Sequence, residues 1–273
     1  MLCFPNAKIN LGLNIVSKRK DGYHNLETVF YPITVCDALE IVPATNGRDS
    51  FTESGISVDV PSENNLVMKA LRLVGAQYDI PPMEVHLLKK IPFGAGIGGG
   101  SADAAFMLKL LNSACNLNMT DDEMAGLALK LGADCPFFIY NRPMFASGIG
   151  EALEDVTLSL DGYTIVLVKP DVHIPTRDAF AQIVPRQPEN PLKEIIRQPL
   201  TEWKKLMFND FERSIFPQYP VVGEIKRQLY RLGAAYASMS GSGSSVYGIF
   251  EHAPENIQSV FNGCYTWQSA TNQ

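Results

Sequence analysis

The chain has 273 residues, of which 46% are hydrophobic and 19% charged, so it is expected to form one large globular domain or two modest ones. A net charge of -6 and a pI near 5.3 argue against a general binder of nucleic acids or anionic membranes. Any phosphate group would therefore be bound at one site, by backbone amides and a few lysines. Five dispersed cysteines without C-x-x-C spacing, no signal-peptide core and no membrane-spanning apolar run indicate a cytoplasmic protein.

The first part of the chain is expected to alternate strands with helices. Imperfect alternation predicts a strand over residues 7–16 and one or two more over 29–42, while the polar segment 46–53 is typical of a hairpin end. Helical spacing of apolar residues predicts a helix over 65–78. A strand over 83–91 then leads into a glycine-rich segment.

The next predicted elements follow that segment. Ser101 is expected to cap a helix whose apolar face continues to Cys115. Thr120 with Glu123 forms a capping-box pattern for a helix that stops near Gly132.

The character of the chain changes near residue 155, where a domain boundary is expected. A strand over 163–169 is followed by proline-rich loops, and helices are predicted around 191–197, 203–208 and 221–232. A strand–glycine–strand unit closes the chain over 234–250. We therefore predict domains 1–155 and 156–273.

Residues 92–101, here called the first glycine loop, contain five glycines in seven positions and run straight into a helical pattern. Glycines let consecutive amides turn toward one point, and a helix N-terminus presents unpaired N–H groups with partial positive charge. Together these features favour a phosphate site over a flexible turn.

Two familiar phosphate-binding patterns fit the first glycine loop poorly. Residues 94–99 match G-x-G-x-x-G, but the acids about 20 residues on, Asp121 and Asp122, lie just after a helix cap and not at the end of a strand. A Walker A loop would need Lys-Ser/Thr where Ser101 and Ala102 stand. A loop without its own lysine needs a cation from elsewhere.

Two residues outside the loop are candidates for chemistry. Lys8 and Asn10 are expected side by side on one face of the first predicted strand, although the sequence alone favours an ordinary surface lysine at position 8. Asp134 stands in apolar company before Cys135, which Pro136 is expected to hold extended. Asp134 fits either a catalytic carboxylate with a perturbed pKa or an Asx-turn that closes a helix.

Two further turns carry suggestive residues. Tyr23 and His24 place an aromatic ring beside an imidazole, a pair that suits a flat heterocycle or simply covers a sheet. Residues 239–244, here called the second glycine loop, read Met-Ser-Gly-Ser-Gly-Ser between two predicted strands. This composition favours contact with an anion, and a hairpin turn remains the alternative. The other histidines show no metal-ligand spacing.

Six motifs in order resemble the galactokinase–homoserine kinase–mevalonate kinase–phosphomevalonate kinase (GHMP) superfamily. The resemblance covers nearly the whole chain and rests on residues 5–11, 21–24, 92–105, 132–138, 148–151 and 239–243. It implies a two-domain α/β (α+β) kinase with a ribosomal-S5-like N-terminal domain, a ferredoxin-like C-terminal domain, and ATP with Mg²⁺ at the cleft between the halves.

The resemblance also implies the site residues, and Lys8 and Asp134 take its catalytic positions. The adenine and phosphates of ATP would contact Asn65, Pro92, Gly94, Gly96, Gly98, Gly99, Gly100 and Ser101. The branch of the superfamily with the greatest likeness implies a cytidine-diphosphate methylerythritol as substrate. Its pocket would be formed by Asn10, Tyr23, His24, Thr176 and Phe180, with two aromatics sandwiching the cytosine and His24 reading its edge.

The chain also departs from the superfamily pattern. Ala102 replaces a second serine, which puts a role of this position in phosphate or metal contact in doubt, and 185–202 matches nothing. The rival hypotheses are a homoserine or mevalonate kinase of the same superfamily, a non-catalytic binding protein and a dinucleotide-binding oxidoreductase. Neither nucleic acid nor membrane is expected as a partner, and the oligomeric state is left open between monomer and homodimer.

Overall fold

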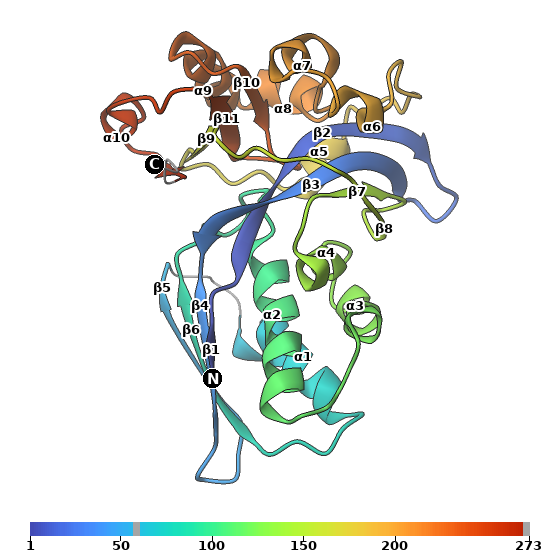
Figure 1. Ribbon diagram of the computed structural model, residues 1–273, viewed down its shortest axis with the longest axis vertical. Coiled ribbons are helices and arrows are strands. Elements are labelled where there is room, and N and C mark those ends of the chain that lie inside the picture. Colours follow the sequence, from blue (N-terminus) through green and yellow to red (C-terminus); the bar gives the residue numbers. More distant parts are fainter. Residues whose placement is uncertain (57–60, 270–273) are drawn as a thin grey trace. The chain divides into compact units, whose positions relative to one another are not determined.

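The computed structural model describes residues 1–56 and 61–269, which divide into two compact units (Figure 1). Unit 1 comprises residues 1–7, 34–93 and 98–142, and unit 2 comprises residues 8–33, 94–97 and 143–273. Both units are discontinuous in sequence, whereas the predicted domains 1–155 and 156–273 are continuous. The predicted division at residue 155 refers to the two domains of the family and stays a prediction.

Unit 1 is built on a four-stranded sheet with the order β1-β4-β6-β5. Its strands are β1 (Leu2–Cys3), β4 (Ala38–Pro43), β5 (Ser50–Gly55) and β6 (Met83–Lys89). The strand predicted over 83–91 is confirmed as β6, which alternates buried and outward residues. The expected hairpin end over 46–53 is wrong in its second half, because β5 pairs in parallel with β6. Its exposed edge position permits the polar sequence that suggested a turn.

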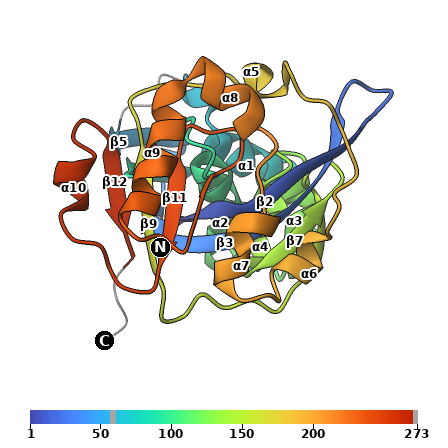
Figure 2. The ribbon, with the colours of Figure 1, turned by 90° about the horizontal axis from the view of Figure 1, so that it is seen from above.

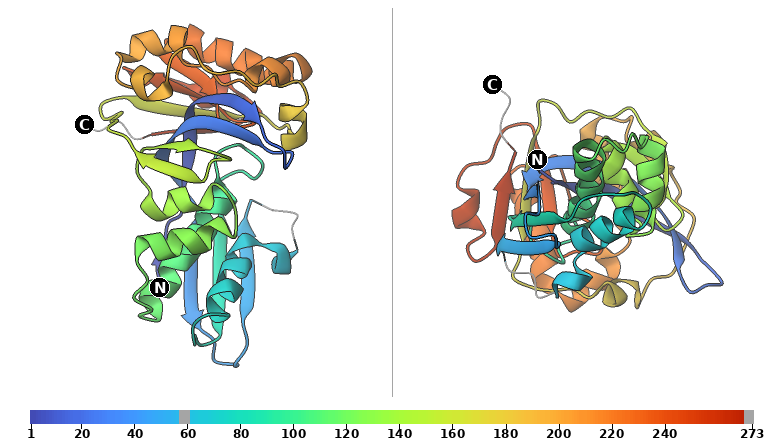
Figure 3. Two further views of the ribbon diagram at one scale, coloured as in Figure 1. Left: turned by 90° about the vertical axis from the view of Figure 1, so that its right-hand side faces the viewer. Right: turned by 90° about the horizontal axis from the view of Figure 1, so that it is seen from below.

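Helices cover one face of this sheet, with α2 against β4 and β1 and α1 beside α2 (Figures 1 and 3). The helical elements are η1 (Ser62–Asn64), α1 (Leu66–Gly75), α2 (Gly99–Ala114), α3 (Asp121–Leu129) and α4 (Cys135–Tyr140). The capping box of α3 is confirmed, with reciprocal hydrogen bonds between Thr120 and Glu123. Among the described residues, no helix is long and apolar enough to cross a bilayer.

The first sheet of unit 2 has the order β2-β3-β7-β8. Its strands are β2 (Asn6–Lys18), β3 (His24–Cys36), β7 (Met144–Ser147) and β8 (Ala152–Asp155). The strand predicted over 7–16 is confirmed as part of β2, and the one or two strands predicted over 29–42 are β3 and β4. The first residues of β2 and the last residues of β3 belong to unit 1.

The second sheet of unit 2 has the order β10-β11-β9-β12 and is antiparallel throughout. Helices intervene between β9 and β10 and between β11 and β12, which gives the β-α-β-β-α-β order of a ferredoxin-like fold. The strands are β9 (Thr164–Lys169), β10 (Tyr236–Met239), β11 (Val246–Phe250) and β12 (Tyr265–Gln268). The helices of unit 2 are α5 (Thr176–Phe180), α6 (Leu192–Ile195), α7 (Leu200–Leu206), α8 (Glu212–Gln218), α9 (Pro220–Arg231) and α10 (Ile257–Val260).

Helices α8 and α9 pack together beside this sheet, and α9 contacts β10 and β11 (Figure 2). Their buried members Ile215, Val222 and Leu229 join Leu13 and Ile15 of β2 in one hydrophobic core. Burying such side chains contributes about 1.5–3 kcal/mol each relative to exposure. This core therefore fixes the segment that precedes α8 against β2.

Several local predictions are wrong for a shared reason, the treatment of glycine and proline as breakers. Ser101 does not cap α2, because the helix already begins at Gly99 and its N-cap is Gly98 in the left-handed region. Cys135 is not extended, since it opens α4 with Pro136 in the first turn, where a missing N–H costs no helical hydrogen bond. The short helices α5 and α8 were not predicted, and α7 begins three residues earlier than the predicted 203–208.

Candidate active site

The first glycine loop adopts a backbone conformation that suits the binding of an anion. Gly94, Gly96 and Gly98 have φ values of 63°, 73° and 74°, so every second residue lies in the left-handed region. Such alternation turns successive N–H groups toward a common anion. The 16-residue helix α2 follows directly, and its N-terminus has no side-chain cap. Donors and dipole at this position suit a phosphate group.

The loop leaves no room for side chains at its closest approaches. A Cβ built on Gly96 would lie 2.2 Å from the Ser240 carbonyl oxygen, and one on Gly99 would lie 2.7 Å from Ile91 Cγ2. A Cβ on Gly100, by contrast, would meet only Leu66 at an ordinary 3.8 Å. Pro92, at the start of the loop, is buried. The fold thus explains the glycines at 96 and 99 but not the one at 100.

Lys8 is a buried lysine of unit 2 and not a surface one, since its exposed fraction is 3%. Its ammonium donates to Asn10 Oδ1 at 2.6 Å and to the Gly96 carbonyl at 3.4 Å, and it lies 4.7 Å from the centre of the Phe30 ring. The Lys8 N–H also donates to the Ile97 carbonyl at 2.9 Å. The structure therefore places this predicted cation at residues 94–97 of the first glycine loop.

The second glycine loop meets the same group of residues. The Ser240 hydroxyl donates to the Gly96 carbonyl at 2.9 Å and accepts from the Asn10 N–H at 3.2 Å. The Ser245 N–H donates to the Ala95 carbonyl at 3.1 Å. The loop joins the antiparallel neighbours β10 and β11, as a hairpin does. Within unit 2 it is thus a support for residues 94–97.

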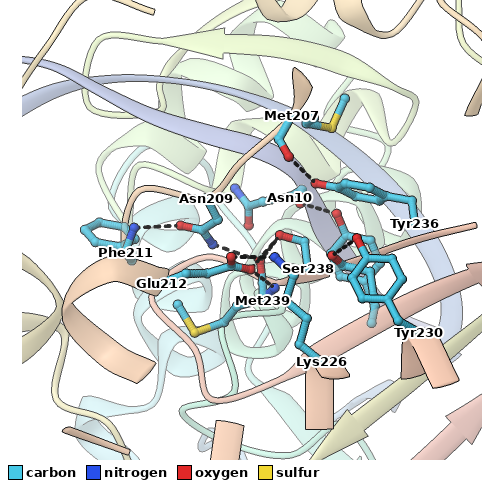
Figure 4. Close-up of polar contacts among 12 residues, drawn as sticks. Asn10, Met207, Asn209, Phe211, Glu212, Lys226, Tyr230, Tyr236, Ser238 and Met239 are labelled. Atoms are coloured by element: carbon cyan, nitrogen blue, oxygen red, sulfur yellow. Dashed lines mark hydrogen bonds and ion pairs between the residues drawn. The ribbon is translucent and has the colours of Figure 1, made fainter. Parts of the chain in front are cut away.

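Two side chains, one from the segment before α8 and one from α8, form hydrogen bonds with the backbone of the second glycine loop (Figure 4). Asn209 donates to the carbonyls of Met239 and Gly241, each at 2.8 Å. Glu212 accepts from the Met239 N–H at 2.9 Å and from the Ser238 hydroxyl at 3.0 Å, while its other oxygen pairs with Lys226 at 2.6 Å. Sequence reasoning missed Asn209 and Glu212, which no local motif distinguishes from surface residues.

Asp134 is the half-buried N-cap residue of α4 in unit 1 and makes no side-chain capping hydrogen bond. An Asx-turn would need the N–H of residue 136, and Pro136 has none. The neighbouring Cys135 is buried, which raises the pKa of its thiol to about 12, although a hydrogen bond with Ser101 opposes the shift. Asp134 and Ser101 therefore flank one buried thiol that stays neutral.

Asn65 has a structural task in unit 1 that the sequence did not reveal. It is the N-cap of α1, and its side chain accepts from the Val67 N–H at 2.9 Å. Its amide nitrogen donates to Glu53 Oε2 of β5 at 3.2 Å. The Asn65 side chain is thereby held at the start of a helix, which is compatible with its predicted place near the adenine.

The predicted substrate residues are only partly brought together. His24 stacks on Phe180 with ring centres 4.9 Å apart and planes 21° apart, and Phe211 supports Phe180 edge-on at 4.8 Å. Tyr23 is 62% exposed, and Thr176 at the start of α5 is exposed as well. Burial, with a smaller contribution from Lys18, lowers the pKa of His24. The His24 imidazole, and not Tyr23, covers Phe180 in this structure.

Each unit therefore contributes features that suit an anion, with the buried Lys8 in unit 2 and the uncapped start of α2 in unit 1. Within residues 1–56 and 61–269, no cluster of three or more His, Cys, Asp or Glu side chains is arranged for a metal. The family model of the GHMP kinases' N-terminal domain matches residues 65–142, and the model of their C-terminal domain matches residues 192–265. A 4-diphosphocytidyl-2-C-methyl-D-erythritol kinase of Parabacteroides distasonis is 60% identical over 271 residues, 98% of either chain.

The chain belongs to the GHMP kinases. A crystal structure of a 4-(cytidine 5'-diphospho)-2C-methyl-D-erythritol kinase superposes with a TM-score of 0.83 at 30% identity, covering 98% of both chains. A homoserine kinase from Cytophaga hutchinsonii, at 17% identity and a TM-score of 0.69, covers 98% of this chain and 96% of its own, and shares the fold alone. The mixed α/β fold expected of a two-domain GHMP kinase is thereby confirmed.

Proposed function

We propose that this chain transfers the γ-phosphoryl group of ATP to the 2-hydroxyl of 4-diphosphocytidyl-2-C-methyl-D-erythritol, a step of the non-mevalonate (methylerythritol phosphate) route to isopentenyl diphosphate. The observation that carries the proposal is the 60% identity over nearly the full length to a kinase of that name. The buried Lys8 at residues 94–97 of the first glycine loop supports it.

The donor would be held by backbone and helix rather than by a loop lysine. The uncapped start of α2 and the alternating φ values of the first glycine loop offer amide donors to the phosphates, with Pro92, Gly94, Gly96, Gly98, Gly99, Gly100 and Ser101 in this role. Asn65 would contact the adenine. Mg²⁺, when bound with the nucleotide, would neutralise charge on the phosphates.

In the reaction, the substrate hydroxyl oxygen forms a bond to the γ-phosphorus while the bond from that phosphorus to the bridging oxygen breaks, so that ADP leaves. Asp134 accepts the hydroxyl proton. Lys8 offsets the negative charge on the transferred group, and its contacts with Asn10 and Gly96 fix the ammonium in position. Because phosphoryl transfer depends on positioning and charge, no covalent intermediate with the protein is needed.

The acceptor would be recognised at its cytosine. Phe180, supported by Phe211, offers a ring for stacking, and His24 offers hydrogen-bonding nitrogens to the edge of the base. Binding between Tyr23 and Phe180 requires the His24 ring to leave the face that it now covers. Asn10 and Thr176 would line the rest of the pocket. A cytoplasmic location is in keeping with the five free cysteines.

The proposal is tested with a substrate panel in an ATP-consumption assay. We expect turnover with 4-diphosphocytidyl-2-C-methyl-D-erythritol and none with homoserine or mevalonate. Activity on mevalonate alone would overturn the proposal. Asp134→Asn should lower kcat by about a thousandfold while nucleotide binding, measured by calorimetry, persists. The exposed Asp122→Asn is the matched control, and near-normal kcat in Asp134→Asn would exclude Asp134 as the base.

A further inference from the structure

Three charged side chains lie buried together in unit 1, outside the residues assigned so far. Asp37, Lys89 and Asp103 have exposed fractions of 1%, 4% and 2%. The Lys89 ammonium lies 2.6 Å from Asp103 Oδ2 and also forms an ion pair with Asp37 Oδ2. Burying charges is costly unless they are paired and hydrogen-bonded, so such a cluster needs an explanation.

The cluster holds the chain where it leaves β6. Asp37 Oδ1 accepts the N–H groups of Lys90 at 2.5 Å and Ile91 at 2.8 Å. Lys89 is itself the last residue of β6. The backbone is therefore anchored at three successive residues immediately before Pro92, where the first glycine loop begins.

The same cluster also holds the far end of the loop. Asp103 lies in the second turn of α2, two residues beyond Ser101, and reaches Lys89 across the start of the helix. A Cβ on Gly99 would lie 2.7 Å from Ile91 Cγ2 and 3.6 Å from Lys89 Nζ, so the helix start is seated directly on the anchored segment. One ion cluster thus joins the two ends between which the glycine loop runs.

The cluster has more negative than positive groups. Burial raises the pKa of Asp103 to about 7, and Asp37 adds to the shift while Lys89 opposes it. Asp103 Oδ1 is buried and has no hydrogen-bond partner in the described part of the chain, which agrees with poor stabilisation of its charge. Its two carboxylate partners raise the pKa of Lys89 despite burial, so Lys89 stays charged.

The remaining titratable groups that interact with Asp103 do not change this balance. Burial, with a smaller contribution from the Asp103 charge, raises the pKa of the Cys3 thiol in β1 to about 12, so this thiol stays neutral. Lys109 of α2 and the N-terminal ammonium interact with Cys3. With Asp103 protonated the cluster is neutral, and with Asp103 ionised it carries one negative charge.

We propose that Asp37, Lys89 and Asp103 form a buried positioning cluster that fixes both ends of the first glycine loop and thereby sets the affinity of that loop for the phosphates of the nucleotide. The inference rests on the proposed kinase function. All three side chains are buried and paired with one another or with the backbone at residues 90 and 91, so in this proposal the cluster acts through the loop. Its loss should weaken nucleotide binding more than it slows the chemical step.

The first experiment compares Asp103→Leu, which cuts the connection to α2, with Asp103→Asn, which keeps an acceptor for Lys89. For Asp103→Leu we expect the KM for ATP to rise about tenfold, with kcat and the acceptor KM changed by less than about threefold. The variant Asp103→Asn should keep the KM for ATP near the wild-type value at pH 7. Glu202→Leu, which removes an exposed ion pair with Lys205 on α7, is the matched control.

The second experiment uses pH, because ionisation of Asp103 changes the charge of the cluster whereas the amide introduced by Asp103→Asn cannot ionise. Between about pH 6 and pH 9, the wild-type Kd for ATP should rise relative to that of Asp103→Asn measured at the same pH, which cancels the titration of ATP itself. The ratio of the two Kd values should change around pH 7. This comparison remains available if Asp103→Leu fails to fold.

The outcomes separate this inference from the proposed function. A KM for ATP that is unchanged in folded Asp103→Leu, or a loss of kcat alone, would overturn the positioning role, as would a Kd ratio that does not vary with pH. If the wild type binds ATP but phosphorylates none of the acceptors, the proposed function fails. Calorimetric ATP binding then still tests the cluster.

Discussion

The two glycine loops have similar compositions, but the protein treats their backbones differently. In the second glycine loop, buried side chains take up the carbonyls of Met239 and Gly241 and the N–H of Met239. In the first glycine loop, the residues flanking the glycines are anchored, and the helix start at Gly98 and Gly99 has no side-chain cap. Side chains therefore bind part of the backbone of the second loop, whereas the first loop ends on helix-start donors that suit an external anion.

This difference separates two uses of glycine. Where the loops meet, Gly96 is required because backbone oxygens of residues 240 and 243 occupy the space of a side chain. At Gly100 nothing among the described residues requires glycine, since a Cβ there would make ordinary contacts only. A glycine that the fold does not need is the better indicator of a ligand. The following substitutions test that view, beginning with the largest expected effect.

Gly96→Ala should break the contact between the two loops. The new Cβ would lie 2.2 Å from a carbonyl oxygen at a φ of 73°, so we expect a loss of stability of about 3 kcal/mol and of nearly all turnover. Thermal unfolding and kcat measure the two effects. Gly162→Ala is the control, because its φ is 85° but no atom of residues 1–56 or 61–269 lies within 4 Å of the new Cβ, and it should cost only about 1 kcal/mol. Equal effects in both variants would contradict the steric explanation.

Asn209→Leu should remove the side-chain hydrogen bonds that hold the second glycine loop in place. Two buried carbonyls lose their shared donor, which we expect to cost about 2 kcal/mol in denaturant unfolding. Because Ser240 contacts Gly96 and Asn10, kcat should fall as well, by about tenfold. The exposed Asn190→Leu should change neither quantity. Unaltered kcat in a destabilised Asn209→Leu would show that the loop is not coupled to Lys8.

Gly100→Ala should separate stability from function in the first glycine loop. Alanine is the better helix former by about 1 kcal/mol, and no clash opposes it, so the melting temperature should rise. If the amides of this turn approach a phosphate closely, the KM for ATP should rise about fivefold at the same time. A more stable variant with unchanged KM would show that the glycine serves neither purpose.

The smallest effect is expected at His24, which touches neither glycine loop. Burial holds its pKa below the ordinary 6.5, so the folded protein resists protonation and stability declines as the pH falls below 6.5. Above 6.5 both states are neutral at this residue and the effect is absent. An NMR titration of the imidazole should give a midpoint below 6.5. Phe180→Ala, which removes the stacked ring, should return the midpoint toward 6.5.

Local patterns in the sequence predicted those elements that are stabilised locally. The capping box at Thr120, the apolar periodicity of α1 and the alternation in β2 and β6 all depend on neighbouring residues, and each was predicted correctly. The start of α2 was misplaced because Gly98 and Gly99 were taken as loop. Glycine in the left-handed region ends a helix and equally begins one.

Interactions between distant segments could not be predicted in the same way. The parallel pairing of β5 with β6, the Asn209 contacts with the second glycine loop and the Asp37–Lys89–Asp103 cluster join residues far apart in sequence. One signal was available, because Asp103 interrupts the buried, alanine-rich face of α2 and so needed a buried partner. The sequence did not indicate which lysine that partner was.

The discontinuity of the two units has a practical consequence for anyone who wants to study them separately. Because residues 8–33 and 94–97 belong to the unit that otherwise begins at 143, no single peptide bond divides the chain into the two units. A fragment ending near residue 142 would carry β2 and β3 without β7, which pairs with β3. The hydrogen bonds between Asn10 and Ser240 span 230 residues, so they form only once nearly the whole chain has been synthesised. Nascent chains therefore pass through a long stage in which β2 lacks its final partners, and a truncated protein remains at that stage.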